Sequence, residues 1–334
     1  MASELVEHLQ KRIRNEGPLR FRDYMEEALY HPRFGYYSSD RNPIGFSGDF
    51  FTAPDLDPVF GKILASRFQE MSAGMPSFTV VELGAGKGLL ARHILEHVNF
   101  PYLILERSRA MRLQQQEALK EFNVVWIDEL PSAVQGCVFS NEFFDALPVH
   151  RVVRRGDGLK EIYVTGDFRE IEGPPWPEVD VPVQMMREGQ VVEVNLEARA
   201  WVRRIAESLS AGYHLAIDYG YLRDEFYSQP GGTLMCYWRH QATEDPYVNI
   251  GEQDMTAHVN FSDLIDEGAS AGLSTLSFGN QMNFLIEGGI LHEIQQLVAA
   301  GDAASIQRLV NIKRLILPGG MGERFKVLIQ SKCK

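Results

Sequence analysis

Cysteine is scarce in this sequence, which has three among its 334 residues, at Cys137, Cys236 and Cys333. They are widely separated and show no metal-ligand spacing, so a disulfide framework and a structural zinc site are both disfavoured. We therefore expect a reducing compartment and no bound metal.

Long apolar runs and an excess of positive charge are also absent. No run approaches the roughly 20 residues that span a bilayer, and the N-terminal stretch MASELVEHLQKRIRNEG contains acids, unlike a signal or transit peptide. With 33 Lys and Arg against 45 Asp and Glu, the formal charge of −12 repels phosphate backbones and anionic lipid. We expect a cytoplasmic protein with no membrane insertion and no nucleic-acid partner.

From residue 78 onward, short apolar segments alternate with helical ones. FTVVEL, PYLILE, NVVWID and GCVFSN have the composition of buried strands, and LLARHILEHV and RAMRLQQQEALKEF have helical periodicity. This alternation is typical of a mostly parallel sheet covered by helices on both faces. The sequence therefore predicts an α/β fold.

Four segments can be delimited by changes in this pattern. Residues 1–75 contain a helical segment with apolar Leu5, Leu9 and Ile13 at spacing four, and residues 76–150 hold the first half of the sheet core. Residues 151–195 are expected to form a β-rich insertion. Residues 196–334 complete the core and are expected to include a loop-rich insertion at about 221–260, where periodicity is weak.

The glycine-rich stretch VVELGAGKGLL follows the first predicted strand. Its glycines are Gly84, Gly86 and Gly88, with Ala85 and Lys87 between them. The third glycine stands one residue too early for the dinucleotide pattern G-x-G-x-x-G, and the spacing and the Ser or Thr of a phosphate loop are missing. The loop is thus suited to a nucleoside without phosphate, and Lys87 is expected to point to solvent.

An acid ends each of the first three strands. Glu82 suits a cationic amino group, Glu106 can accept both hydroxyls of a ribose, and Trp126 with Asp128 suits an adenine. Because ligands bind at the carboxyl ends of such strands, the pattern favours S-adenosyl-L-methionine as cofactor. NAD or FAD, and a plain turn with solvated acids, remain the alternatives.

The fourth strand ends in SNEFFDALPVH, where Asn141, Glu142 and Asp145 would border the same crevice. If the methyl acceptor were an arginine, paired carboxylates could hold its planar guanidinium and position it for in-line transfer. We interpret these three residues as catalytic. The alternative is that Asn141 caps a turn and Asp145 caps a helix.

Two further segments are candidates for substrate contact. The loop SGDFFTAPDLDP contains Gly48, Asp49, Thr52 and Pro54, although an acid there could simply cap the following helix. Downstream, His240 and His258 lie in polar, aromatic stretches without zinc spacing. They could bind substrate or belong to a polar network.

Six collinear motifs, spread over nearly the whole chain, resemble the MidA-like methyltransferases: GPLRFRDYMEEALYHPRFGYYSS, GDFFTAPDLDPVFG, VVELGAGKG, SNEFFDALPVHRVV, IDYGY, and GTLMCYWRHQ with GEQDMTAHVNF. The resemblance implies a class I, Rossmann-like methyltransferase fold with α+β insertions. Eukaryotic relatives are mitochondrial and are regarded as arginine methyltransferases that act on a subunit of respiratory complex I. Ala85, Lys87 and Asp55 depart from the residues common in the family, which puts a role for Asp55 in doubt.

The sequence thus predicts an enzyme that methylates a protein substrate on arginine, with a complex I subunit as the partner that the resemblance suggests. An assembly factor that binds cofactor and partner without catalysis, and a small-molecule methyltransferase, are the alternatives. A nicotinamide oxidoreductase is disfavoured by the glycine spacing.

Overall fold

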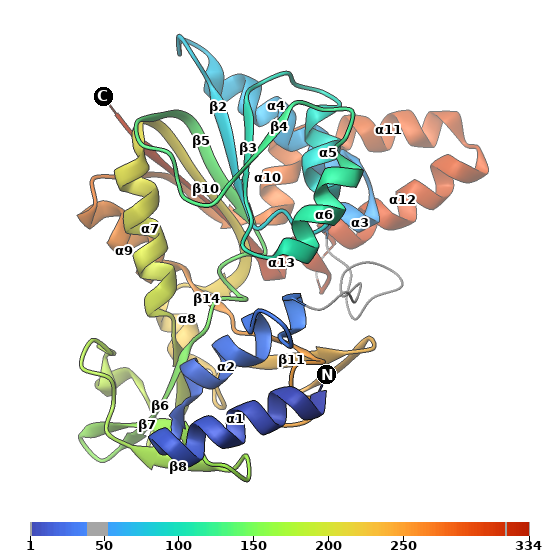
Figure 1. Ribbon diagram of the computed structural model, residues 1–334. Coiled ribbons are helices and arrows are strands. Elements are labelled where there is room, and N and C mark those ends of the chain that lie inside the picture. Colours follow the sequence, from blue (N-terminus) through green and yellow to red (C-terminus); the bar gives the residue numbers. More distant parts are fainter. Residues whose placement is uncertain (1, 39–52, 318, 334) are drawn as a thin grey trace.

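The computed structural model describes residues 2–38, 53–317 and 319–333, which form two lobes (Figure 1). The upper lobe in this view is built on an eight-stranded sheet. The lower lobe combines two smaller sheets with helices α1 (Ala2–Glu16) and α2 (Phe21–Tyr30). None of the helices within the described ranges is long and apolar enough to cross a membrane.

The large sheet has the order β15-β16-β10-β5-β2-β3-β4, with β14 beside β10. Strands β4, β3, β2, β5 and β10 are mutually parallel, whereas β16 runs antiparallel to both of its neighbours, β10 and β15. This confirms the predicted, mostly parallel α/β sheet. The strands are β2 (Thr79–Leu83), β3 (Tyr102–Leu105), β4 (Val124–Ile127), β5 (Val134–Asn141), β10 (Leu209–Tyr221), β14 (Val259–Asn260), β15 (Ser274–Asn280) and β16 (Phe325–Lys332).

Helices cover both faces of this sheet, because its strands are apolar on both sides. Apolar side chains of α4 (Val59–Ser72), α5 (Leu89–Leu95) and α10 (Gln281–Glu287) share one buried cluster with the strands. Those of α7 (Leu196–Ser208) and α9 (Phe261–Ser270) share another. Helices α11 (Ile290–Ala300) and α12 (Ala303–Ile316) form a hairpin that extends sideways from the upper lobe (Figure 1).

The lower lobe is assembled from segments far apart in sequence. Its five-stranded antiparallel sheet consists of β1 (Leu19–Arg20), β6 (His150–Arg155), β7 (Gly158–Val164), β8 (Glu170–Gly173) and β9 (Val191–Val194). Leu5 and Leu9 of α1 are fully buried in one cluster with Val164 and Met255. The predicted 1–75 segment is therefore divided: α1 and α2 pack on the insertions, whereas α3 (Ala53–Leu56) and α4 pack on the large sheet.

The stretch from 221 to 260 has more regular structure than its weak periodicity suggested. It contains α8 (Arg223–Ser228) and a three-stranded antiparallel sheet of β11 (Met235–Trp238), β12 (Gln241–Thr243) and β13 (Asp254–Thr256). These strands are only three or four residues long. Such short strands leave little alternation to detect, which is why the sequence predicted only a loop-rich insertion here.

Candidate active site

A cavity of about 820 Å³ lies at the carboxyl ends of β2, β3, β4 and β5, where the two lobes meet. Its walls come from the glycine loop, from the segments that follow these strands, from α7, and from α2 of the lower lobe. Among the predicted site residues, those that line it are Pro54, Glu82, Gly84, Ala85, Gly86, Glu106, Asp128, Asn141 and Glu142.

The three glycines of the loop all have left-handed backbone conformations, with φ of 64°, 52° and 80° at Gly84, Gly86 and Gly88. A Cβ on Gly84 would lie 2.9 Å from Cδ2 of Phe143, closer than real contacts allow. Gly88 does not line the cavity. It forms the N-cap of α5, and a Cβ there would press on Leu119 at 3.3 Å.

Lys87 does not point to solvent as expected. It lines the cavity, and partial burial lowers the pKa of its ammonium group while the charge of Asp55 opposes that shift. The spacing of residues within the loop does not reveal this position.

Glu82 is 2% exposed, and its Oε2 accepts a hydrogen bond of 2.8 Å from the hydroxyl of Tyr102 on β3. Burial raises the pKa of Glu82 to about 8, against the opposing effect of the Tyr102 hydroxyl. A buried carboxyl of this kind is complementary to a cationic amino group, because a cation would restore its ionised form.

Glu106 is held in place by backbone and side-chain donors. One oxygen accepts from the backbone N–H of Ser108 at 2.8 Å, and the other accepts from Nε2 of Gln115 at 3.1 Å. Burial raises the pKa of Glu106, and these hydrogen bonds oppose the shift. The carboxyl lines the cavity and can accept further hydrogen bonds, as a ribose would require.

Gln115, on α6 (Arg109–Ala118), was not predicted from the sequence. It is fully buried and connects three parts of the site. Besides Glu106, its Nε2 donates to the carbonyl of Gly86 at 2.8 Å, and its Oε1 accepts from Nε1 of Trp126 at 2.9 Å. The stretch LQQQEA gives no signal that the middle glutamine alone is buried.

Trp126 and Asp128 have different positions. The indole of Trp126 donates to Gln115 and packs beside the buried cluster, and it does not line the cavity. Its predicted stacking on an adenine is therefore not supported. Asp128 lines the cavity with a largely exposed side chain, and it accepts a hydrogen bond from Arg112.

Glu142 stands where β5 ends, with a left-handed φ of 53° that is uncommon outside glycine. Its backbone N–H donates to the carbonyl of Ile217 at 2.9 Å, and its Oε1 accepts from Nδ2 of Asn141 at 3.0 Å. Burial, and then the charge of Asp145, raise the pKa of Glu142 to about 8. The hydrogen bond to Ile217 of β10 helps to hold Glu142 in this uncommon backbone conformation. Its carboxyl lines the cavity.

Asp145 does not join Glu142 in the cavity wall. It is 4% exposed and accepts a hydrogen bond from the hydroxyl of Tyr219, while its Oδ1 has no hydrogen-bond partner among the described residues. Nearby, Asp218 accepts from the backbone N–H groups of Phe144 and Asp145 at 3.0 and 3.2 Å. The predicted carboxylate fork is therefore corrected, since Glu142 alone reaches the cavity and Asp145 belongs to the buried network behind it.

The remaining predicted substrate contacts are scattered. Gly48, Asp49 and Thr52 lie outside the described residues. His240 is exposed in the turn between β11 and β12 and does not line the cavity. His258 packs edge-on against the ring of Tyr219 at 5.0 Å, and burial lowers the pKa of its imidazole to about 4. Neither histidine contacts the cavity, which corrects both assignments.

Two tyrosines of the lower lobe complete the cavity wall. Tyr30 donates to the carbonyl of Ala146 at 2.9 Å, and Tyr37 donates to Asp254 at 2.8 Å. Their rings stack at 5.4 Å. These residues lie in the motif GPLRFRDYMEEALYHPRFGYYSS, which was used for the resemblance but was given no role at the site.

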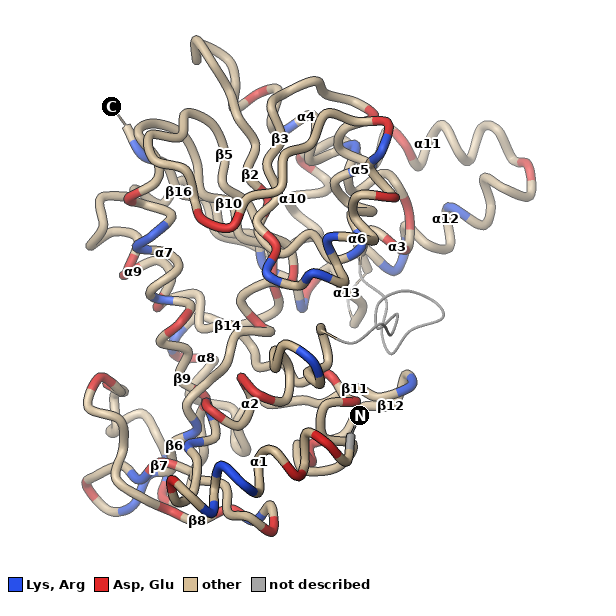
Figure 2. Tube along the Cα trace, viewed as in Figure 1, with Lys and Arg blue, Asp and Glu red and all other residues tan. Residues whose placement is uncertain are grey.

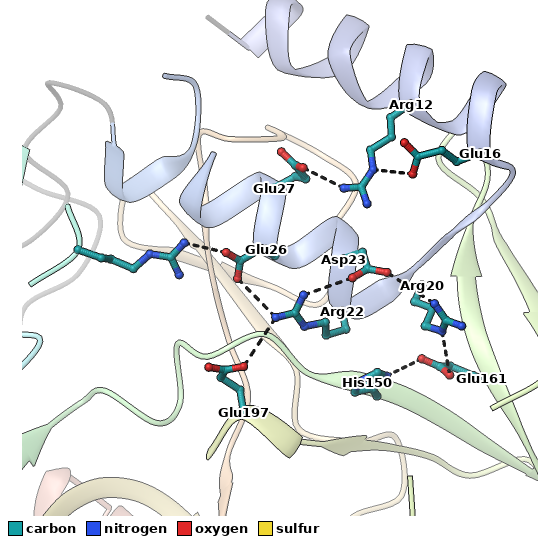
Figure 3. A network of polar contacts seen from close by, with 11 residues as sticks. Arg12, Glu16, Arg20, Arg22, Asp23, Glu26, Glu27, His150, Glu161 and Glu197 are labelled. Carbon is teal, nitrogen blue, oxygen red and sulfur yellow. Dashed lines mark hydrogen bonds and ion pairs between the residues drawn. The ribbon is translucent and has the colours of Figure 1, made fainter. Parts of the chain in front are cut away.

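Charged residues connect α2 to the upper lobe and to the insertion (Figure 3). Nη2 of Arg107 donates to Oε1 of Glu26 at 2.7 Å. Nη2 of Arg22 lies 3.9 Å from Oε2 of Glu26 and 3.8 Å from Oε2 of Glu197 on α7. These residues all border the cavity. The cavity wall on this side is thus built from polar contacts between the two lobes.

Among the described residues, His8, Glu27 and His31 form a group with the composition of a metal site. Nδ1 of His31 accepts from the backbone N–H groups of Arg33 and Phe34 at 3.2 and 3.3 Å, and Glu27 accepts from Arg12 at 2.9 Å. These contacts account for the group without an ion. The prediction that the protein binds no metal remains untested.

The fold and the cavity define a class of enzyme, the S-adenosyl-L-methionine-dependent methyltransferases. The chain belongs to the family described as "Putative S-adenosyl-L-methionine-dependent methyltransferase", which it matches over residues 59–279. It is a methyltransferase, and its cofactor is S-adenosyl-L-methionine.

Similar proteins include a crystal structure of a "likely methyl transferase" from Burkholderia thailandensis bound to S-adenosyl-homocysteine. That structure is 33% identical, covers 99% of this chain and 92% of its own, and has a TM-score of 0.93. The mitochondrial protein arginine methyltransferase NDUFAF7 of Mus musculus is 27% identical over 96% of this chain and 83% of its own length. The Xenopus tropicalis protein of the same name is 29% identical over 100% and 87%.

Proposed function

We propose that this methyltransferase transfers the methyl group to an arginine of a partner protein. The observation that carries the proposal is the position of Glu142, a carboxyl held at the cavity wall by an uncommon backbone conformation. The names of the mouse and frog relatives, protein arginine methyltransferases of similar length, support the same acceptor.

The cofactor fits the residues of the cavity wall. Glu82 would hold its amino group, Glu106 would accept from its ribose, and the loop from Gly84 to Gly86 would lie against the nucleoside. When bound, S-adenosyl-L-methionine supplies an electrophilic methyl group.

Glu142 would hold the guanidinium of the acceptor through charge-assisted hydrogen bonds and direct one nitrogen toward the methyl group. Its raised pKa allows the same carboxyl to take the proton that the nitrogen loses on methylation. Asn141, which donates to Oε1 of Glu142, would position this carboxyl. The stacked rings of Tyr30 and Tyr37, which also line the cavity, would limit access of water.

The substitution Glu142→Gln tests this assignment, because it keeps the shape of the side chain and removes its charge and basicity. We expect methylation of arginine peptides to slow at least about 100-fold, with unchanged binding of S-adenosyl-homocysteine measured by calorimetry. Glu178→Gln, at an exposed position of the insertion, is the matched control. Unchanged methylation by the Glu142→Gln variant would overturn the catalytic role of Glu142, whereas a wild type that methylates no arginine would favour the assembly-factor function.

The identity of the partner is the finer part of this proposal. A subunit of respiratory complex I is the candidate that the family resemblance offers, and a net charge of −12 is compatible with a basic peptide segment. The names of the relatives place those proteins in mitochondria. For this chain we keep the cytoplasm as the proposed location.

A further inference from the structure

The hairpin of α11 and α12 carries large apolar side chains that the described structure leaves exposed. On α11 these are Leu291 and Val298, which are 49% and 63% exposed and lie seven residues apart. On α12 they are Ile306 and Val310, which are 55% and 44% exposed and lie four apart. Spacings of seven and four place each pair on one side of its helix, so each helix carries an apolar stripe.

These stripes are not what attaches the hairpin to the upper lobe. Leu297 and Ile312 are buried in the main cluster. Arg308 donates to both oxygens of the buried Asp57 at 2.9 Å, and Lys62 donates to Glu293 at 2.7 Å. The hairpin is therefore anchored through other side chains, and within residues 2–38, 53–317 and 319–333 its exposed stripes do not serve the fold of the single chain.

The charge of the hairpin differs from that of the rest of the chain. Residues 290–316 contain two acids and three bases, whereas the whole chain has a formal charge of −12. Figure 2 shows few charged positions along α11 and α12 and many elsewhere. Two copies of so acidic a protein repel each other over most of their surfaces. Contact through the hairpins brings together surfaces with almost no net charge.

We propose that the hairpin is the contact surface of a symmetric dimer, in which the stripes of one copy pack against those of a second. A two-fold contact requires one surface that is complementary to itself, and a nearly neutral apolar hairpin meets that requirement. At 1.5 Å per residue the helices are about 16 and 21 Å long. Such a face is at the small end of specific interfaces, so we expect a dissociation constant of about 1–10 µM.

Sedimentation equilibrium of the full chain between about 0.5 and 100 µM tests the dimer. We expect the wild type to dimerise, and Val298→Glu or Ile306→Glu to weaken association at least about 100-fold, because each buries an unpaired charge in the contact. Leu276→Glu is the matched control. It adds the same charge at a residue of β15 that is 58% exposed and lies outside the hairpin, so its association should equal that of the wild type.

Thermal unfolding of each variant checks its fold, and Ile306→Lys, with the opposite charge, provides a second substitution on α12. A wild type that stays monomeric at the highest concentration would overturn the proposal. Hairpin variants that associate as tightly as Leu276→Glu would overturn it too. Methyl transfer by the variants is not used as a readout, so this test is independent of the acceptor proposed above.

Discussion

At the scale of single residues, the cavity is marked by carboxyls with raised pKa values. Glu82 and Glu142 both have a pKa of about 8, mainly because burial disfavours their charged forms. Among the described residues, no cationic group offsets the effect of burial on either carboxyl. The cavity is therefore adapted to cationic ligands, which would ionise the two groups on binding.

The raised pKa of Glu82 makes cofactor affinity depend on pH. Below about pH 8 the carboxyl must lose its proton to pair with the amino group of the cofactor. Affinity for S-adenosyl-homocysteine should therefore rise by up to about tenfold per pH unit from pH 6 to 8. Calorimetry at several pH values measures this, and Glu82→Gln should abolish the dependence. A flat profile in the wild type would contradict the assignment.

Stability of the ligand-free protein should change in the opposite direction. A carboxyl whose pKa is raised from 4.5 to about 8 binds its proton more tightly in the folded state, so it stabilises the fold fully below pH 4.5. That contribution is lost as the pH rises through 8. Denaturant titrations should show a smaller loss between pH 5 and 8 in Glu82→Gln than in the wild type, because the variant keeps only the contribution of Glu142. If the free energy of unfolding depended on pH in the same way in both proteins, the raised pKa of Glu82 would be contradicted.

Gln115 is predicted to position the cofactor site without contacting the reacting atoms. Gln115→Leu keeps most of the volume and removes three hydrogen bonds, to Gly86, Glu106 and Trp126. We expect affinity for S-adenosyl-homocysteine to fall at least about tenfold and stability to fall by about 1–3 kcal/mol. Gln116→Leu, the exposed neighbour on α6, should change neither. If Gln115→Leu and Gln116→Leu bound S-adenosyl-homocysteine equally tightly, Gln115 would have no role in positioning the cofactor site.

At the scale of elements, the segment after β3 joins the predicted cofactor site to the lower lobe. The guanidinium of Arg107 lies 4.2 Å from the ring centre of Tyr30, and Oγ of Ser108 donates to the carbonyl of Tyr37 at 2.6 Å. Arg107 and Ser108 directly follow Glu106 in the sequence. Binding of a ribose to Glu106 should therefore also restrain α2 and the turn at Tyr36–Ser38.

Hydrogen exchange measures this coupling. S-adenosyl-homocysteine should slow amide exchange in residues 21–38 about tenfold and leave the hairpin of β7 and β8 unchanged. Arg107→Ala should reduce the protection of residues 21–38, because it removes the contacts with Glu26 and Tyr30. If ligand protected only the glycine loop and β3, the lower lobe would be independent of cofactor binding.

The elements also show which features the sequence could predict. The parallel strands were predictable because their buried residues are contiguous, and so were Glu82 and Glu106, because strand ends converge in such sheets. Packing between distant segments decides three features that the sequence did not predict. These are the position of Lys87, the burial of Gln115, and the absence of Asp145 from the cavity wall that Glu142 lines. The packing of α1 could not be predicted from the 1–75 segment for the same reason, since α1 packs on strands more than a hundred residues away.

At the scale of the whole molecule, the cavity belongs to neither lobe alone. The upper lobe supplies the glycine loop, Glu82, Glu106 and Glu142, whereas Tyr30 and Tyr37 come from the lower lobe. A protein-sized acceptor would have to reach Glu142 from the junction of the lobes. The dimer proposed through the hairpin would leave that junction open, because the hairpin extends from the side of the upper lobe (Figure 1).

The most direct test of the central claim is peptide mapping by mass spectrometry of proteins from cells that contain the wild-type enzyme, the Glu142→Gln variant, or neither. We expect at least one protein to carry methylated arginine only in the wild-type cells, with the same arginine unmodified in the other two. Arginine methylation that is identical in all three cell lines, or a wild-type-dependent methyl group only on a small molecule, would contradict the account.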